Sequence, residues 1–272
     1  MIKLAYLCAA GAIAGGVLVS AQQSPQQSPP PPQPGPGQGS TYMPQPRRQF
    51  GTSITGAFEG WYYNPDGSRS FLIGYFNRNT QQELDVPIGP NNNIEPGGPD
   101  MGQPTHFLPG RQWGMFTVAA PKEFKDTDSY VWTLTANGIT NRIPLRLKSD
   151  YVMSPFEEIA VHNTPPVLRW EQGGPSVQGP ISTLVKAPSR NASLDMPFAL
   201  TAWAADDMKY TNGTSAPLTA NRQPVTMRFS KYRGPGKVTF DKVSPAVEKL
   251  PAGEGGAPFN GKATTNVKFS EA

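Results

Sequence analysis

The chain is poor in side chains that perform chemistry, with two histidines and one cysteine among 272 residues. His106 is the better candidate for a general base, because Asp100 and Arg111 lie close to it in the sequence. Closeness in sequence does not establish the geometry of a site, however. We therefore expect His106 to be a surface residue between Pro104 and Pro109 with no catalytic partner. The sequence therefore supports a hydrolase centred on His106 less well than it supports a scaffolding or a carbohydrate-binding function.

The familiar catalytic motifs are missing from the sequence. The chain has no Gly-x-Ser-x-Gly turn, no His-Glu-x-x-His pair and no glycine-rich phosphate loop. The second histidine, His162, adjoins the boundary between two expected domains, where a structural role is expected. The sequence therefore predicts a protein that is not an enzyme and that uses no cofactor.

Calcium is the most plausible metal for a chain of this kind, because it needs only oxygen ligands. Asp126 and Asp128 form one close pair of carboxylates, and Asp206-Asp207 forms another. Neither pair is followed by the glycine and the distant glutamate of a calcium loop. We predict no metal site.

Aromatic residues offer a different kind of site, because their rings can stack on sugars or pack against a partner. Alternation along strands places about half of such side chains inward, and a core without disulfides needs large residues, so core packing is the more frequent role. The candidate stacking residues are Trp61, Tyr62, Tyr63 and Trp113.

One long polar segment, from Asp85 to Gly110, interrupts the expected strands. A loop of about 25 residues is uncommon inside a compact domain and is usually either functional or mobile. We predict that any partner binds at this segment. Its candidate binding residues are Asp85, Glu95, Asp100, His106 and Arg111.

Positive charge is scattered along the chain rather than clustered. The formal net charge is +4, and the basic residues occur as the pair Arg47-Arg48 or as alternate residues of one strand face, Arg142, Arg146 and Lys148. A nucleic-acid-binding surface needs a basic stripe with stacking aromatics. We therefore exclude nucleic acid as a partner.

The first 21 residues predict export. Lys3 gives a positive start, residues 4–19 are apolar, and Val19-Ser20-Ala21 suits signal peptidase, so we expect cleavage before Gln22. The apolar run is short and glycine-rich for a membrane span, so no stable span is expected after cleavage. The expected location is secreted or periplasmic, with cell-surface association left open.

Beyond the leader, the composition divides the chain into a linker and a folded body. Residues 22–49 are rich in proline, glutamine and serine and predict a disordered, semi-stiff linker. The rest consists of short β-branched and aromatic runs separated by turn residues, which predicts an all-β protein. We expect two Ig-like antiparallel β-sandwich domains, over residues 50–161 and 165–272. The mature chain has no cysteine, but about 220 residues suffice for two cores without disulfides.

Several strands follow from local patterns. Phe71 to Phe76 is apolar on both faces and predicts a strand buried on both sides. Residues 131–147 predict a hairpin that turns at Asn137-Gly138, a pair suited to a type I′ turn. In the second domain, side chains alternate inward along three stretches: Phe198, Leu200 and Ala202; Val225, Met227 and Phe229; and Ala263, Thr265, Val267 and Phe269.

The stretches 198–207, 224–240 and 263–270 together resemble the polycystin-type Ig-like modules (PKD-like domains) of exported bacterial proteins. The resemblance covers the last 75 residues, and Lys231 to Phe240 is its most specific part. It implies an Ig-like sandwich for this region. The first domain, around Gly60 to Gly67 and Gly74 to Asn79, is similar to uncharacterised modules of exported bacterial proteins, which implies a location and no chemistry.

In the resembled family, two further strands follow the segment at which the given sequence stops, at Ala272. The resemblance therefore implies that five inward side chains are partly uncovered: Val225, Met227, Phe229, Val267 and Phe269. Burying such a side chain is worth roughly 1.5–3 kcal/mol, so several uncovered ones could cancel a typical net stability. We expect a truncated sequence; a donor strand from another chain and a rearranged minimal sandwich are the alternatives.

These patterns favour an exported, non-enzymatic protein for adhesion, scaffolding or ligand presentation, with a protein or carbohydrate partner. The alternative is an accessory carbohydrate-binding module of a polysaccharide-degrading system. Coplanar exposed aromatics on one face would favour the carbohydrate function. A pocket that joins His106 to Asp100 or Glu95 would favour an enzyme, and a flat surface with a mobile long loop would favour a scaffold.

Overall fold

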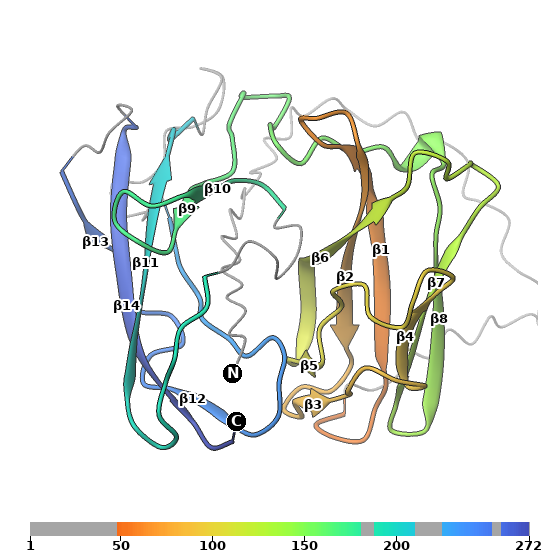
Figure 1. The fold of residues 1–272 in the computed structure, drawn as a ribbon, viewed down its shortest axis with the longest axis horizontal. Coiled ribbons are helices and arrows are strands. Elements are labelled where there is room, and N and C mark those ends of the chain that lie inside the picture. Colours follow the sequence, from red (N-terminus) through yellow and green to blue (C-terminus); the bar gives the residue numbers. More distant parts are fainter. Residues whose placement is uncertain (1–47, 181–187, 210–224, 252–256, 272) are drawn as a thin grey trace, which may run out of the picture.

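The computed structural model describes residues 48–180, 188–209, 225–251 and 257–271. The regular elements in these ranges are strands and one short 3-10 turn, η1 (Ser149–Tyr151), and the named strands pair antiparallel (Figure 1). The prediction of an all-β protein is confirmed. The predicted leader and nearly all of the predicted linker lie outside the described residues. Within the described ranges, no helix has the length and apolar character that crossing a membrane requires.

The strands β1 to β8, here called the N-terminal unit, form two three-stranded sheets and a small ladder. The first sheet has the order β1-β2-β6 and the second has the order β4-β7-β8. The bounds of these strands are β1 (Ile54–Tyr63), β2 (Arg69–Asn77), β4 (Asn92–Glu95), β6 (Gly110–Ala120), β7 (Tyr130–Ala136) and β8 (Ile139–Leu145). The ladder pairs β3 (Leu84–Asp85) with β5 (His106–Phe107).

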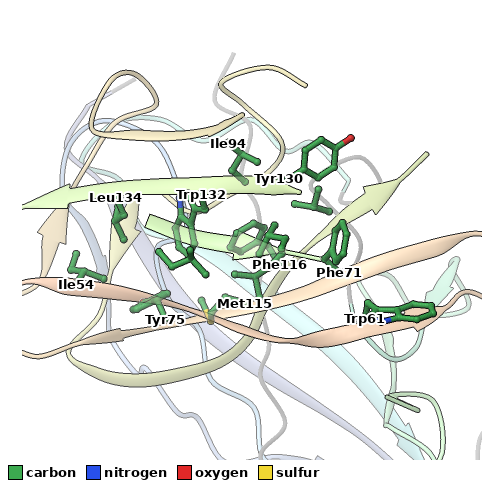
Figure 2. Close-up of a cluster of buried hydrophobic side chains, with 14 of the residues drawn as sticks. Ile54, Trp61, Phe71, Tyr75, Ile94, Met115, Phe116, Tyr130, Trp132 and Leu134 are labelled. Atoms are coloured by element: carbon green, nitrogen blue, oxygen red, sulfur yellow. The ribbon is translucent and has the colours of Figure 1, made fainter. Parts of the chain in front are cut away.

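An aromatic core fills the space between the two sheets. Trp132 is fully buried, with the ring of Phe116 edge-on at 5.2 Å and the ring of Phe107 stacked at 6.4 Å. Figure 2 shows Trp132 and Phe116 among the buried side chains between the strands. A Cβ atom at Gly56 would lie 2.6 Å from the Trp132 ring, so only glycine lets β1 pass this close.

The strand β2 is buried on both faces, as its apolar run predicts, because residues 70–75 are all buried. Hydrogen bonds also link β1 to the chain that follows β7. The Asn141 side chain donates to the carbonyl of Ile54 at 2.9 Å, and the Trp61 indole donates to the carbonyl of Lys148 at 2.7 Å. The two sheets are therefore held together along this side by specific bonds as well as by packing.

The hairpin between β7 and β8 turns as predicted. Asn137 and Gly138 both have positive φ, at 48° and 76°, and Ala136 pairs with Ile139, as a type I′ turn requires. The side chains of Ile143, Leu145 and Leu147 are buried.

Replacing Gly138 by alanine is expected to lower the free energy of unfolding by about 1–2 kcal/mol. An added Cβ would meet no atom within 4 Å, so the loss comes from the left-handed backbone alone. Asparagine tolerates this conformation better, so G138N should lose less than G138A. Urea denaturation of both variants measures the difference, and equal losses would contradict the backbone explanation.

The strands β9 to β14, here called the C-terminal unit, form one sheet with the order β10-β9-β11-β14-β12, and β13 also pairs with β14. The longest ladder joins β11 to β14, from Phe198↔Val267 to Asp206↔Phe259. The bounds are β9 (Val167–Arg169), β10 (Ser176–Val177), β11 (Phe198–Asp206), β12 (Val238–Phe240), β13 (Glu248–Lys249) and β14 (Phe259–Phe269).

The expectation of uncovered core residues in this unit is wrong. Val225, Met227, Phe229, Val267 and Phe269 are each at most 4% exposed. Residues 225–229 belong to no named strand, yet their alternate side chains pack in one cluster with those of β11 and β14. The segment covers the sheet face without extending a second ladder. Two separate buried clusters fit the predicted division into two domains.

Candidate functional site

The segment from Asp85 to Gly110, here called the long loop, is not an unbroken loop as expected, because it contains the strands β4 and β5, which pair with β7 and β3. The C-terminal unit contacts the surface of this segment. The contact is made by Lys231, Tyr232 and Arg233, here called the junction segment, which approaches β3 and β5 from the connection before β12 (Figure 1). The backbone amides of Thr105 and His106 both donate to the carbonyl of Tyr232 at 3.2 Å.

Tyr232 is the apolar centre of this contact. Its side chain is 6% exposed and belongs to the buried cluster of the N-terminal unit, although the residue lies far along the chain in the C-terminal unit. Its hydroxyl donates to the carbonyl of Gly102 at 2.6 Å. Burial raises the pKa of this hydroxyl, so it remains a protonated donor.

Two charged hydrogen-bonding groups flank Tyr232. The Lys231 ammonium donates to Asp85 Oδ1 at 2.9 Å and to the carbonyl of Gly236 at 2.7 Å. The Arg233 guanidinium binds both carboxylate oxygens of Asp100, at 2.8 and 3.1 Å, and donates through Nε to the carbonyl of Gln103 at 2.6 Å. Two-point binding of a carboxylate by arginine fixes orientation as well as distance.

The long loop is held from its inner side by Asn92 of β4, which is fully buried. The Asn92 amide donates to the carbonyls of Val86 and Pro104 at 2.9 and 2.8 Å, and its oxygen accepts from the Trp132 indole at 2.9 Å. The surface that receives the junction segment is thus built on the aromatic core.

His106 is buried, so the expectation that it is a surface residue is wrong, and its ring lies against two carboxylates. It is 7% exposed, its Nδ1 lies 3.0 Å from Asp85 Oδ1, and its Nε2 lies 3.3 Å from Glu83 Oε2. The β3–β5 ladder pairs Asp85 with His106 directly, which explains the contact. In the part of the chain that the structure describes, the polar groups facing the two imidazole nitrogens are these two carboxylates.

The other residues predicted for the long loop do not join His106. Asp100 binds Arg233, and Glu95 is an exposed residue of β4 that pairs with Val131. Arg111 binds Glu59 at 2.8 Å, and its guanidinium lies 3.8 Å from the centre of the Trp113 ring. The structure therefore distributes the five candidates over four separate places, and of the five only Asp85 contacts His106.

Glu59 and Arg111 form a partly buried pair on the β1-β2-β6 sheet. Glu59 also accepts from the amide of Gly114 at 2.9 Å. Burial raises the pKa of the Glu59 carboxyl, against the lowering effect of its bonds to Gly114 and Arg111. A Cβ at Gly74 would lie 2.2 Å from Glu59 Oε1, so glycine is required where the pair crosses β2.

Two of the four candidate stacking aromatics are core residues. Trp61 is 6% and Tyr62 is 1% exposed, which corrects the expectation that they could stack on a ligand. Tyr63 and Trp113 are exposed, at 58% and 68%. Tyr63 pairs with Arg69 of β2, and Arg69 pairs with Ala120 of β6. Trp113 lies seven residues from Ala120 along β6, so Tyr63 and Trp113 are about 20 Å apart and cannot stack on the same ligand ring.

A cleft of about 790 Å³ opens beside the junction segment. It is lined by residues of both units, including Glu83, Asp85, His106, Lys231, Lys237 and Glu271. Neither Asp100 nor Glu95 lines it, so the pocket that would have favoured an enzyme is not the one observed. In the part of the chain that the structure describes, no three His, Cys, Asp or Glu side chains are grouped so as to hold a metal ion.

The junction is expected to weaken in acid. Hydrogen bonds from Arg233 lower the pKa of Asp100 below its usual 3.8; burial alone would raise the pKa of Asp85, but its bonds to Lys231 and His106 lower it overall. Carboxyl groups with lowered pKa values stabilise the folded state above pH of about 4, and this stabilisation is lost as the pH falls through the folded-state values.

Thermal unfolding at pH 7 and pH 3 measures this effect, with D100N as the comparison. The loss of melting temperature between the two pH values should be smaller in D100N, which has no charge to lose at this position. An identical pH dependence in the two proteins would show that the Asp100–Arg233 pair contributes nothing.

Comparison with known proteins provides no relative: no family model, no curated protein and no solved structure matches the chain. The resemblance to PKD-like modules therefore stays a prediction. The roles of Glu83 and of the junction segment were missed from the sequence. The sequence signal that could have indicated the junction segment is a tyrosine between two cations, directly before a Gly-Pro-Gly turn, at Lys231 to Gly236.

Proposed function

We propose that this protein is an exported, non-enzymatic scaffold that holds two β-structured units in a fixed orientation and presents their surfaces to a partner. One observation carries the proposal. The side chains best suited to chemistry bind one another where the units meet: Lys231 with Asp85, Asp85 with His106, and Arg233 with Asp100. A general base needs a nitrogen available to its substrate, and both nitrogens of His106 already face carboxylates.

The fixed orientation follows from the kind of contact at the junction. Flexible tandem domains meet across linkers with few contacts, so that relative motion is the default. Here a buried tyrosine, charged hydrogen bonds and two backbone amides fix one segment at several points. Such a junction supports a scaffold, because a scaffold works only if its surfaces keep their spacing.

Export is proposed from the sequence of residues 1–49, a leader followed by a proline-rich linker. The test is expression with the native N-terminus in a bacterial host, fractionation, and intact-mass spectrometry. The exported fraction should contain a chain that begins at Gln22. A full-length chain confined to the cytosolic fraction would contradict this part of the proposal.

Carbohydrate binding is the second candidate, and Trp113 is the observation that favours it. The Trp113 indole is 68% exposed, and the Arg111 guanidinium packs over the ring. An exposed ring whose orientation is fixed in this way is suited to stacking on a sugar. Affinity electrophoresis in gels containing soluble polysaccharides compares the wild type with W113A. Retardation that W113A abolishes would favour this function over the scaffold, whereas unretarded migration of both proteins would exclude it for the polysaccharides used.

A further inference from the structure

We propose that the cleft beside the junction segment binds a small organic cation with an aliphatic body, of the linear polyamine class. This inference goes beyond the scaffold function and does not depend on export. It rests on the cleft itself, on the charges that line it and on the apolar side chains between them.

The cleft has two walls, one from each unit. The N-terminal unit contributes Glu83, Asp85 and Ile88, and the C-terminal unit contributes the turn from Gly234 to Val238 together with Glu271. The volume of about 790 Å³ is within the range of small-molecule sites, roughly 300–1,000 Å³. Because the Lys231–Asp85 bond joins the two walls at 2.9 Å, the cleft is formed before any ligand arrives.

The charges that line the cleft have a small negative excess, with three carboxylates and two ammonium groups. Glu83, Asp85 and Glu271 are exposed carboxylates, whereas Lys237 is the exposed cation among the lining residues. The Lys231 ammonium and the Asp85 carboxylate bind each other at 2.9 Å, so their charges offset each other. Glu83, which lies 3.3 Å from His106, and Glu271 then remain against Lys237. A chain with a net charge of +4 thus has a cleft of the opposite sign. A cation, not an anion, matches this lining.

The lining also favours a cation with methylene groups over a compact inorganic ion. Pro87, Ile88, Pro235 and Val238 contribute apolar surface to the lining beside the carboxylates of the two walls. An ammonium at each end of an aliphatic chain could meet carboxylates on opposite walls while its methylenes contact these side chains. A linear polyamine has this form.

Isothermal titration calorimetry of the mature protein with spermidine at low salt tests the proposal. Saturable one-site binding is expected, and E83Q/E271Q should weaken it by about tenfold or more, since each carboxylate contributes a modest charge interaction. Both replaced side chains are exposed, so the fold should survive. E95Q, which removes an exposed carboxylate outside the cleft, should leave the affinity unchanged.

Methyl NMR locates the ligand independently of the heat signal. Spermidine should shift the methyl resonances of Ile88 and Val238, and triethylene glycol, of similar length but uncharged, should not. No binding at millimolar spermidine, or equal affinity in the wild type and E83Q/E271Q, would overturn the proposal. Neither outcome would alter leader cleavage or the orientation of the units, so failure here is distinguishable from failure of the scaffold function.

Discussion

Replacing Tyr232 by alanine is expected to lower the free energy of unfolding by about 3–5 kcal/mol, the range for removing a large buried ring. The ring is part of the buried cluster of the N-terminal unit, so its loss leaves a cavity there and removes the apolar contact between the units. The hydroxyl bond to Gly102 is lost as well, which leaves that carbonyl without this donor. Guanidinium denaturation followed by tryptophan fluorescence measures the loss.

Two variants define the origin of this effect. Y232F keeps the ring and removes only the hydroxyl bond, so its loss should be about 1–3 kcal/mol. Y63A removes an exposed tyrosine and should cost less than either, since Tyr63 is 58% exposed. A Y232A protein that is no less stable than Y63A would show that the ring does not hold the units together.

Replacing Asn92 by alanine is expected to cost about 3–5 kcal/mol. Its side chain bonds to the carbonyls of Val86 and Pro104 and to the Trp132 indole, and all three bonds are in the buried interior. A buried polar group that loses its partner costs about 1–3 kcal/mol. The loss should also reach the junction, because Thr105 and His106, which donate to Tyr232, follow Pro104 directly.

The adjacent residue provides a matched control. Asn93 also donates to two carbonyls, those of Gly89 and Pro90, but at a partly exposed position where water can replace the bonds. N93A should therefore cost about 1 kcal/mol or less. Urea denaturation of both variants gives the comparison, and similar losses for N92A and N93A would contradict the role of Asn92 in fixing the long loop.

Structural features that depend on a short local sequence pattern could be predicted. The β7–β8 hairpin depends on Asn137-Gly138 and on alternation around it, both readable in a dozen residues. The burial of β2 on both faces follows from its continuous apolar run. The inward faces of β11 and β14 follow from side chains at every second position, and the structure confirms them.

Features that depend on distant contacts could not be predicted. Lys231 and Asp85 are 146 positions apart, and no local pattern links them. The partners of His106 depend on β3 and β5, strands of two residues that carry no periodic signal. Tyr62 was expected to be a candidate for stacking, but Phe156, from a remote segment, packs against it edge-on at 5.5 Å.

The covering of the C-terminal sheet illustrates the same difficulty. The alternation of Val225, Met227 and Phe229 correctly identified the inward side chains, but not the structure in which they are buried. Family resemblance implied that further strands were needed, whereas a segment without ladder pairing covers the sheet face instead. Alternation identifies which side chains face the core and does not specify what lies opposite them.

Residual dipolar couplings of a chain spanning residues 22–272 in solution test most directly whether the junction segment makes one rigid body of the two units. Amides of β1, β2 and β6 in the N-terminal unit, and of β11 and β14 in the C-terminal unit, are measured in the same aligned sample. The account predicts that a single alignment tensor fits both sets with the orientation of the structure. Two tensors of different magnitude, one for each unit, would contradict it.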